Sequence, residues 1–511
     1  MIAPARRAAF DTLRAVESRR TDLPSALARA RAPLHDERDR ALAGEIATGT
    51  LRWQGAFDHV IEQFARRAPS RLDPDVLIIL RMGMFQLLHL ARVPASAVVD
   101  DAVDMTRAAG KRSAAGFVNA ILRRVSRERD HLPLPAAEEH GKTATEKHGK
   151  PATEKHGKTQ TVRDRTTATE KHEKTQTVRD RTTATEEHRK TQNVDRTAAI
   201  DYLSITLSHP AWLVARWLDR YGFEAAEAWA WFNNAPAPLT LRANTLRTSR
   251  DDLASALAER DVETAPARFA PDALIVRGGN PLLTDLAHTG LFVVQDEASQ
   301  LVGAFVSPSP GDRVFDVCAS PGGKSTQMAA AMRDEGLIVA ADVRGRRVDL
   351  LARTVRESGA TSIRVVQADA AGPLPFDAIF DLVLVDAPCS GLGTIRRDPE
   401  IRWRRHASDL AALAAAQLNI LTHAAACVRP GGRLIYATCS SEPEENDEVV
   451  AAFLARTPAF HRAARTPFDD EPVLDGLLDE ARQLRTLPHR DGLEAFFAVA
   501  LVAGAGPAIN S

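Results

Sequence analysis

The sequence predicts a multidomain protein in which an all-α domain precedes an α/β domain built on a parallel sheet. Three observations carry this prediction. Apolar residues recur every three or four positions through residues 4–130, which is the period of a helix with one buried face. Residues 133–198 contain almost no large hydrophobic side chains. From residue 290 onwards, short apolar runs alternate with helical stretches, as they do in βαβ units.

The composition is that of a folded protein. The chain has 511 residues, of which 44% are hydrophobic and 26% charged, and this excludes a wholly disordered or collagen-like chain. The 66 Lys and Arg residues nearly balance the 67 Asp and Glu residues, so the net charge indicates no class of partner. The four cysteines form no C-x-x-C pair. We therefore expect free thiols in a reducing compartment, without a metal centre or a disulfide framework.

No segment predicts a membrane protein. The first 20 residues contain Asp11 and Glu17, where a secretory signal would be apolar. Two stretches lack charge, at residues 410–428 and 495–511. The first is rich in alanine and contains polar side chains, and the second is short and interrupted by glycine and proline, so neither resembles a membrane span. We expect a cytoplasmic monomer.

The helical domain, residues 1–132, is basic. Residues 4–130 carry a net charge of +6, and the excess gathers near the end of the domain. A small helical domain with a basic end suits contact with phosphate groups, so Arg123 and Arg124 are candidate RNA-binding residues. A solvated charged face explains the same pattern equally well.

The segment 133–198 differs sharply in composition from the rest of the chain. Eight of the ten lysines lie in it, and a unit of 16 residues that begins at Thr159 recurs nearly intact from Thr175. A repeat without a recurring apolar face cannot form a solenoid core. We therefore expect a disordered linker that loosens the coupling between the domains. Repeat duplication explains its histidines better than a metal site does; they are His148, His156, His172 and His188.

Two folded parts are predicted after the linker. Residues 199–287 mix helical stretches with short strands, which indicates a small α+β subdomain. Residues 288–503 form the predicted α/β domain, and residues 504–511 form a tail. The apolar runs predicted as its strands are 314–317, 337–341, 363–366, 382–385, 433–437 and 496–502.

A glycine-containing loop follows the first of these strands. Ligands bind at the carboxyl ends of parallel strands, and glycines there allow backbone N–H groups to approach an anionic or polar ligand. The loop shares Gly-Lys-Ser with a P-loop but has a cysteine at the position of the first P-loop glycine, and the G-x-G-x-x-G pattern of dinucleotide-binding loops is absent. The loop reads Cys318, Ala319, Ser320, Pro321, Gly322, Gly323, Lys324, Ser325.

Acidic residues after the next strands favour S-adenosylmethionine as the cofactor, on a Rossmann-like sheet. Asp342 lies 20 residues after Gly322, which is the spacing of an acid that binds ribose hydroxyls. Asp369 is placed to accept from the adenine amino group. Two acids would repel a triphosphate. Asp386 follows a fourth strand, as does the acid that holds magnesium beside a P-loop, so an ATPase stays open as the alternative.

Two cysteines follow neighbouring strands, Cys389 after the fourth and Cys439 after the fifth. A buried cysteine is usually a small, inert hydrophobic residue, and this fits Cys427 on its alanine-rich helix. Two thiols in polar loops beside a cofactor cleft indicate covalent catalysis instead. Position alone leaves open which of the two thiols attacks.

Three motifs resemble the small-subunit rRNA cytosine-5 methyltransferases of the Sun/Fmu/RsmB type, within the Nol/Nop/Sun superfamily. They are CASPGGKS at 318–325, DAPCSGLGTIRRDPEIRW at 386–403 and YATCSSEPEEN at 436–446. The first domain is similar to the family's NusB-like RNA-binding domain, and residues 240–247 look like the start of its RNA-contacting subdomain. The resemblance implies a class I S-adenosylmethionine-dependent methyltransferase that forms 5-methylcytosine in 16S rRNA.

The resemblance also implies roles for the site residues. Cys439 would add to C6 of the cytosine, and Cys389 would assist release of the product. Asp386 would hold the N3/N4 edge of the base and lie near the methionine part of the cofactor, and Lys324 would hold the geometry of the cofactor or of the active site. We expect Lys324 or loop N–H groups to lower the pKa of the attacking thiol below its usual value of about 8.5.

Three arginines after the second motif's cysteine, Arg396, Arg397 and Arg402, are candidate contacts to RNA phosphates. Salt bridges to Asp398 and Glu400 would explain them as well.

The sequence departs from the family pattern at Ser320, where alanine is commoner, and before Phe496, where a usual glycine is missing. Residues 441–444 fit a capping box at the start of a helix. Two other functions stay open, an RNA-binding ATPase or assembly factor and a non-catalytic NusB-like binding module. The intact Cys439 argues against the second of these.

Overall fold

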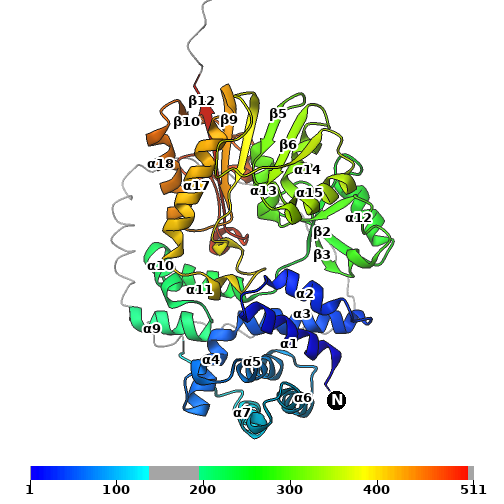
Figure 1. The fold of residues 1–511 in the computed structure, drawn as a ribbon, viewed down its shortest axis with the longest axis vertical. Helices are drawn as coiled ribbons and strands as arrows, with labels where there is room; N and C mark the ends of the chain where they lie inside the picture. Colours follow the sequence, from blue (N-terminus) through cyan, green and yellow to red (C-terminus); the bar gives the residue numbers. More distant parts are fainter. Residues whose placement is uncertain (1, 137–194, 505–511) are drawn as a thin grey trace, which may run out of the picture.

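The computed structural model describes residues 2–136 and 195–504. Figure 1 shows a helical domain at the bottom and an α/β domain at the top, with a further group of helices beside the junction. The predicted linker with its histidines, and the predicted tail, lie almost entirely outside the described residues. Helix α9 (Arg196–Asp201) begins within the last residues of the segment that we expected to be linker.

The N-terminal domain is built around one helix that is buried on all sides. This is α5 (Pro74–His89), in which every residue over 76–86 is buried. Asp73 caps its start by accepting hydrogen bonds from two backbone N–H groups, and proline occupies the first helical position. The helices around it each pack through an apolar face. They are α1 (Pro4–Glu17), α2 (Leu23–Arg31), α3 (Glu37–Arg52), α4 (Gln54–Ala65), α6 (Ala95–Ala108) and α7 (Ala115–Arg127).

The small α+β part consists of two units. In the first unit, Trp217 and Trp229 stack with ring centroids 4.9 Å apart. It comprises α9, a π-helical turn (Tyr202–Thr206), α10 (Ala211–Tyr221) and α11 (Phe223–Asn234). The second unit is an antiparallel sheet with the order β2-β3-β1-β4, packed against α12. Its elements are β1 (Thr240–Ala243), α12 (Arg250–Ala258), β2 (Glu263–Pro266), β3 (Ala273–Gly278) and β4 (Phe292–Val294).

The α/β domain contains an eight-stranded sheet with the order β10-β12-β9-β8-β5-β6-β7, in which β11 pairs with β12. Strands β5 to β9 are parallel, as predicted. The last strand, β12, is antiparallel to both β9 and β10, so the sheet is mixed. The strands are β5 (Arg313–Asp316), β6 (Leu337–Asp342), β7 (Ile363–Gln367), β8 (Phe380–Asp386), β9 (Val428–Thr438), β10 (Phe460–Arg462), β11 (Leu484–Thr486) and β12 (Phe496–Ala503).

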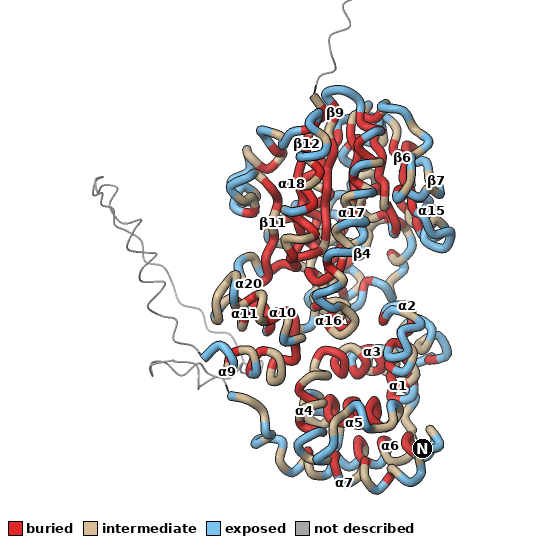
Figure 2. The backbone as a smooth tube through the Cα atoms, turned by 60° about the vertical axis from the view of Figure 1, so that its left-hand side comes forward, coloured by how far each residue is buried: buried red, intermediate tan, exposed pale blue. Residues whose placement is uncertain are grey.

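Helices cover both faces of this sheet, and Figure 2 shows its strands as the most buried part of the molecule. Phe305, Met328 and Leu351 belong to the core on one face, and Leu421 and Phe453 to the core on the other. Burying a side chain of this size contributes about 1.5–3 kcal/mol. The predicted fold class is confirmed. The covering helices are α13 (Glu297–Val306), α14 (Gly323–Ala331) and α15 (Gly345–Ser358), and opposite them α17 (Asp409–Ala425) and α18 (Asp447–Arg456).

The helical domain packs directly against the α/β domain at α16 (Ile401–Arg404). Trp403 Nε1 donates to the carbonyl oxygen of Leu51 at 2.7 Å. Glu400 Oε1 accepts a hydrogen bond from the backbone N–H of Leu23 at 2.9 Å. The expectation of loose coupling between the domains is therefore wrong, because contacts between the folded parts fix their arrangement whatever the length of the segment between them.

Candidate active site

The carboxyl ends of strands β5 to β9 meet at one edge of the sheet, where the loops that follow them line one cavity. Residues far apart in the sequence converge there because parallel strands end together. The predicted site residues that line the cavity are Cys318, Ser320, Asp342, Asp369, Asp386, Cys389 and Cys439. The predicted residues of the glycine loop that do not line it are Ala319, Pro321, Gly322, Gly323 and Lys324.

The glycine loop turns sharply from β5 into α14. Gly322 has a φ of +108°, and a Cβ atom there would lie 2.9 Å from Leu351 Cδ1, so the position requires glycine. Ser325, in the first turn of α14, donates from Oγ to Asp316 Oδ2 at 2.6 Å. Burial raises the pKa of Asp316 to about 7. This buried hydrogen bond ties the start of the helix to the end of β5.

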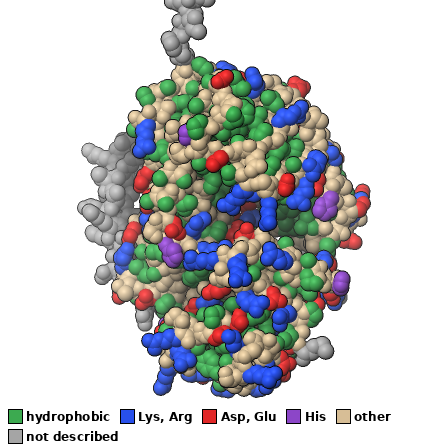
Figure 3. Space-filling view, viewed as in Figure 1, with side chains coloured by type: hydrophobic (Ala, Val, Ile, Leu, Met, Phe, Trp, Pro, Cys, Tyr) green, Lys and Arg blue, Asp and Glu red, His purple; other side chains and the backbone are tan. Residues whose placement is uncertain are grey.

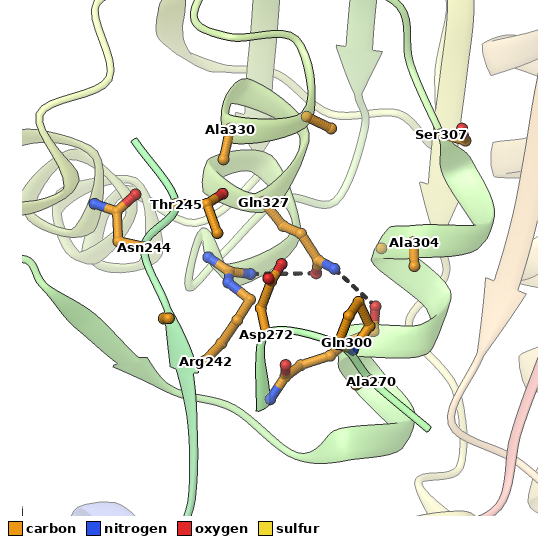
Figure 4. Close-up of a pocket in the computed structure, with 14 residues that line it drawn as sticks. Arg242, Asn244, Thr245, Ala270, Asp272, Gln300, Ala304, Ser307, Gln327 and Ala330 are labelled. Carbon is orange, nitrogen blue, oxygen red and sulfur yellow. Dashed lines mark hydrogen bonds between the residues drawn. The ribbon is translucent and has the colours of Figure 1, made fainter. Parts of the chain in front are cut away.

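A buried arginine that the sequence analysis missed holds the glycine loop from behind. Arg242 on β1 donates to the carbonyl oxygen of Gly323 and, at 2.8 Å, to Thr326 Oγ1. Figure 4 shows Arg242 together with Gln327 and Gln300 in a second pocket, which shares no lining residue with the cavity of the thiols. Arg242 thus fixes the small subdomain to the glycine loop. The sequence signal that could have identified Arg242 is its position in the motif at residues 240–247.

Two carboxylates in the cavity suit a nucleoside. Asp342 at the end of β6 is only 4% exposed; it accepts from the backbone N–H of Arg344, and its Oδ2 lies 3.4 Å from Arg347 Nε. Asp369 accepts from the backbone N–H of Ala371 at 2.9 Å. A carboxylate has about four acceptor positions, so both can accept further hydrogen bonds. These two acceptors fit the ribose hydroxyls and the adenine amino group of S-adenosylmethionine, all of which donate.

The two thiols meet where neighbouring parallel strands end. Cys389 follows β8, Cys439 follows β9, and their Sγ atoms are 3.2 Å apart. Beside them, Lys324 Nζ on α14 donates to Asp386 Oδ2 at 2.7 Å. The four residues with predicted catalytic roles therefore form one cluster.

The pKa of Cys439 is raised well above its usual value, contrary to the lowered pKa that we expected. The contact with Cys389 is the largest cause, followed by burial, and the negative charge of Asp386 adds to them. Lys324 acts in the opposite direction, but its charge is balanced by the carboxylate it binds. In this arrangement Cys439 is therefore a neutral thiol at physiological pH.

A buried glutamate joins the two cysteine loops. Glu445 is 0% exposed, and its Oε1 accepts from the backbone N–H of Ser390 at 2.7 Å and from Gln417 Nε2 at 2.9 Å. Its Oε2 accepts from the hydroxyls of Ser390, at 2.6 Å, and Ser440. One carboxylate therefore holds the residues that follow both thiols. Glu445 lies in the motif at 436–446, and no role for it was predicted from the sequence.

Residues 441–444 do not form the expected capping box. A short 3₁₀ turn (Pro443–Glu445) begins there without a side-chain cap. Glu442 is completely buried and pairs with Arg216, at 2.5 Å, and with Arg220, both on α10. Partners from a distant helix therefore determine where this acid lies.

Profiles of three known families match the chain in succession. The NusB family matches residues 3–127, the RsmF/B-like ferredoxin-like domain residues 209–282, and the 16S rRNA methyltransferase RsmB/F family residues 304–502. The ribosomal RNA small subunit methyltransferase B of Pseudomonas putida is 32% identical over 461 residues, which is 89% of each chain. The chain belongs to the RsmB/F methyltransferase family. A Bacillus subtilis protein named "Probable ribosomal RNA small subunit methyltransferase B" is 31% identical over 468 residues, 90% of each chain.

Solved structures share the RsmB/F fold. The crystal structure of PH0851 superposes with a TM-score of 0.73 at 24% identity, over 98% of this chain and 99% of that one. A methyltransferase homologue from Pyrococcus horikoshii gives a TM-score of 0.50 at 26% identity, over 60% of this chain and 99% of that one. The predicted resemblance is confirmed, as is S-adenosylmethionine as the methyl donor.

The arginines after the second RsmB/F motif lie in three different environments. Arg402 is 0% exposed and donates to the carbonyl oxygens of Arg52 and Ser208, so the expectation that it contacts an RNA phosphate is wrong. Arg397 pairs with Asp296 and, at 2.8 Å, with Glu494, rather than with the acids that we expected.

The remaining candidate RNA contacts stay predictions. Arg396 donates to the carbonyl oxygen of Pro236 at 2.6 Å and lies 4.3 Å from the ring centroid of Phe232. On α7, Arg123 is exposed, and Arg124 pairs with Glu128 at 3.0 Å.

Within 2–136 and 195–504, no helix has both the length and the apolar character of a membrane span. In the same ranges, no group of three or more His, Cys, Asp or Glu side chains could hold a metal ion.

Proposed function

We propose that this protein forms 5-methylcytosine in 16S ribosomal RNA, with Cys439 as the nucleophile and Cys389 as the group that assists product release. The observation that carries the proposal is the pair of thiols 3.2 Å apart in a cavity that also presents the acceptors for a nucleoside cofactor. The rRNA substrate is taken from the family, whose curated members are named for it.

The chemistry requires a thiol because C5 of an aromatic cytosine is a weak nucleophile. When the Cys439 thiolate forms a bond to C6, the electron pair of the C5–C6 double bond becomes available at C5. The cofactor, when bound, would supply a sulfonium methyl group to C5 and would leave as the neutral thioether as the methyl–sulfur bond breaks. Loss of the C5 proton then restores the double bond and expels the sulfur as the C6–S bond breaks. Covalent catalysis of this kind divides one difficult step into easier ones.

The charged residues at the thiols support this division of roles. Asp386 is an acceptor for the N4 amino group of cytosine, and Lys324 fixes its orientation through their 2.7 Å contact. Since the Cys389 contact is the largest cause of the raised pKa of Cys439, a base that separates the two sulfur atoms would favour the Cys439 thiolate. The nucleophile would thus be activated by its substrate.

An ATPase has no comparable support. A P-loop lysine must be available to the phosphates, whereas Lys324 is bonded to Asp386.

The test uses unmodified 16S rRNA transcribed in vitro and S-adenosylmethionine carrying a labelled methyl group. The wild type is expected to produce labelled 5-methylcytidine, identified by mass spectrometry of the nucleosides. Cys439→Ser should lower the rate by at least about 10³-fold, while Cys427→Ser, at a cysteine outside the cavity, should retain it. Label in another nucleoside, or a Cys439→Ser variant of full activity, would disprove the proposal.

A further inference from the structure

The two thiols of the active-site cavity lie close enough to react with each other. Cys389 and Cys439 are free cysteines whose Sγ atoms are 3.2 Å apart. A disulfide bond is about 2.05 Å long, so the two sulfur atoms need to approach each other by about 1.1 Å. The proposed methylation uses the thiols in separate roles, and none of its steps joins them.

The backbone beneath the thiols has the spacing that a disulfide requires. The neighbouring parallel strands β8 and β9 pair through Asp386 and Ala437, shortly before the two cysteines. Such strands lie about 4.8 Å apart, and a disulfide joins Cα atoms that are about 4.4–6.8 Å apart. The backbone N–H of Gly393 also donates to the carbonyl oxygen of Cys439 at 3.0 Å, which holds the two loops together. Rotation of the two side chains can therefore join the sulfur atoms without movement of the strands.

The buried Glu445 fixes the residue that follows each thiol. Its carboxylate accepts hydrogen bonds from Ser390, which follows Cys389, and from Ser440, which follows Cys439. The hydroxyl oxygens of the two serines are themselves 3.3 Å apart. Because both loops are held at this point, the two sulfur atoms stay within reach of each other.

Small solutes can reach both thiols. Cys389 and Cys439 are partly exposed and line one cavity of about 250 Å³. Figure 3 shows the surface hollowed between the helical domain and the α/β domain, on the side where the parallel strands end. A water molecule occupies about 30 Å³ in the liquid, and hydrogen peroxide is only slightly larger, so the cavity admits it. Cys427, by contrast, is 1% exposed and does not line the cavity.

An oxidant of the peroxide class can convert the two thiols into a disulfide. One sulfur, as its thiolate, attacks a peroxide oxygen; an S–O bond forms, the O–O bond breaks, and hydroxide leaves and takes up the proton that this thiol lost. The second thiol attacks the resulting sulfenic acid; the S–S bond forms, the S–O bond breaks, and water leaves with the second proton. The two sulfur atoms are thus oxidised, and one peroxide is reduced to two molecules of water.

The surroundings of the pair make the first of these steps slow and the second fast. The pKa of Cys439 is raised, chiefly by its contact with Cys389 and then by burial, so little of its thiolate is present to attack a peroxide. Once one sulfur is a sulfenic acid, the other thiol is already beside it and does not have to diffuse. The sulfenic acid is therefore consumed before it can be oxidised further to the sulfinic acid, which thiol reductants do not restore.

We propose that Cys389 and Cys439 form an oxidative modification site, at which a peroxide converts the pair into a disulfide and a thiol reductant restores it. This proposal rests on the proposed function, because the disulfide removes both the nucleophile and the group that assists product release. Methylation stops while the disulfide is present, and the nucleophile is protected against irreversible oxidation.

The test treats the full-length protein with hydrogen peroxide and examines it by mass spectrometry before and after addition of dithiothreitol. The treated protein should lose the mass of two hydrogen atoms, and peptide maps without reductant should join Cys389 to Cys439. The rate of 5-methylcytidine formation should fall at least about tenfold and return to within about twofold of the untreated rate with dithiothreitol. Cys427→Ser, at the buried cysteine, is the control and should form the same linkage. In Cys389→Ser, Cys439 should instead gain oxygen atoms that dithiothreitol does not remove.

The outcomes separate this proposal from the proposed function. Oxygen added to the wild type without a linkage between Cys389 and Cys439, or a linked protein that keeps its full rate, would overturn the modification site even if 5-methylcytidine forms normally. A loss of activity that dithiothreitol does not restore would overturn it as well. A reversible linkage in a protein that never forms 5-methylcytidine would overturn the proposed function and leave the modification site supported.

Discussion

The cavity of the thiols differs in the compensation of its charges from the cleft between the helical and α/β domains, whose charged lining residues are Glu45, Arg52, Arg396 and Arg397. Beside the cavity, Lys324 pairs with Asp386, and the buried Glu445 accepts four hydrogen bonds. In the cleft, Arg52 and Arg396 pair with no carboxylate among the described residues. Fixed hydrogen bonds hold reacting groups in a precise geometry, whereas uncompensated charge attracts a ligand. The comparison shows that compensated charges fix the geometry around the thiols, whereas Arg52 and Arg396 have no paired carboxylate among the described residues.

The largest effect is expected from removing the charge that joins the two cysteine loops. Glu445→Gln should lower kcat about 10²–10³-fold with little change in the Kd for RNA, because a small displacement of the thiols is enough to slow the reaction. Single-turnover rates and RNA binding measure the two quantities separately. Glu448→Gln, at an exposed acid three residues on, is the control. A normal kcat in Glu445→Gln would show that the bridge does not position the thiols.

Two equally buried arginines extend the comparison to the free energy of unfolding. Arg6 and Arg52 are both 8% exposed in the helical domain, but Arg6 pairs with Asp101 at 2.5 Å. Arg6→Met should lower the free energy of unfolding by about 3 kcal/mol, because it leaves a largely buried carboxylate unpaired. Arg52→Met should change it by less than about 1 kcal/mol, since only a weak hydrogen bond is lost. Urea unfolding measures both. Equal losses would show that Arg52 is compensated after all.

The smallest effect concerns the acid beneath the glycine loop. The pKa of Asp316 in the folded protein, about 7, lies above its ordinary value of about 3.9, mainly because of burial. Its contribution to stability is therefore present at low pH and is lost as the pH rises through 7. Asp316→Asn should reduce the difference in unfolding free energy between pH 5 and pH 8 by about 2 kcal/mol. The control Asp349→Asn, at an exposed acid on α15, should leave the difference in unfolding free energy between pH 5 and pH 8 unchanged.

The part of the site that the sequence predicted is the part that follows strand ends. Cys389, Cys439 and the acids after the parallel strands could be brought together from the chain alone, because the topology of a parallel sheet places those positions at one edge. The fold class could be predicted from the helical period and from the alternation of strands with helices, because both patterns are visible in short stretches of the sequence.

What could not be predicted depends on partners from distant segments. Arg402 was expected at an RNA phosphate but is completely buried and donates to the carbonyl oxygens of Arg52 and Ser208. Glu444 was expected to be the acid of a capping box, but it pairs with Arg216 on α10. The pKa of Cys439 was expected to fall but rises, because the 3.2 Å contact with Cys389 outweighs Lys324. Burial and pairing of this kind have no signal in the local sequence.

The most direct test of the central claim is to trap the covalent intermediate. Cys389→Ala, incubated with 16S rRNA and S-adenosylmethionine, should accumulate a denaturation-resistant RNA–protein adduct, because release is impaired while Cys439 can still attack. Peptide mapping should locate the nucleotide on Cys439, and the Cys389→Ala/Cys439→Ser double variant should form no adduct. An adduct that persists in the double variant, or maps to another residue, would contradict the assignment of Cys439 as the nucleophile.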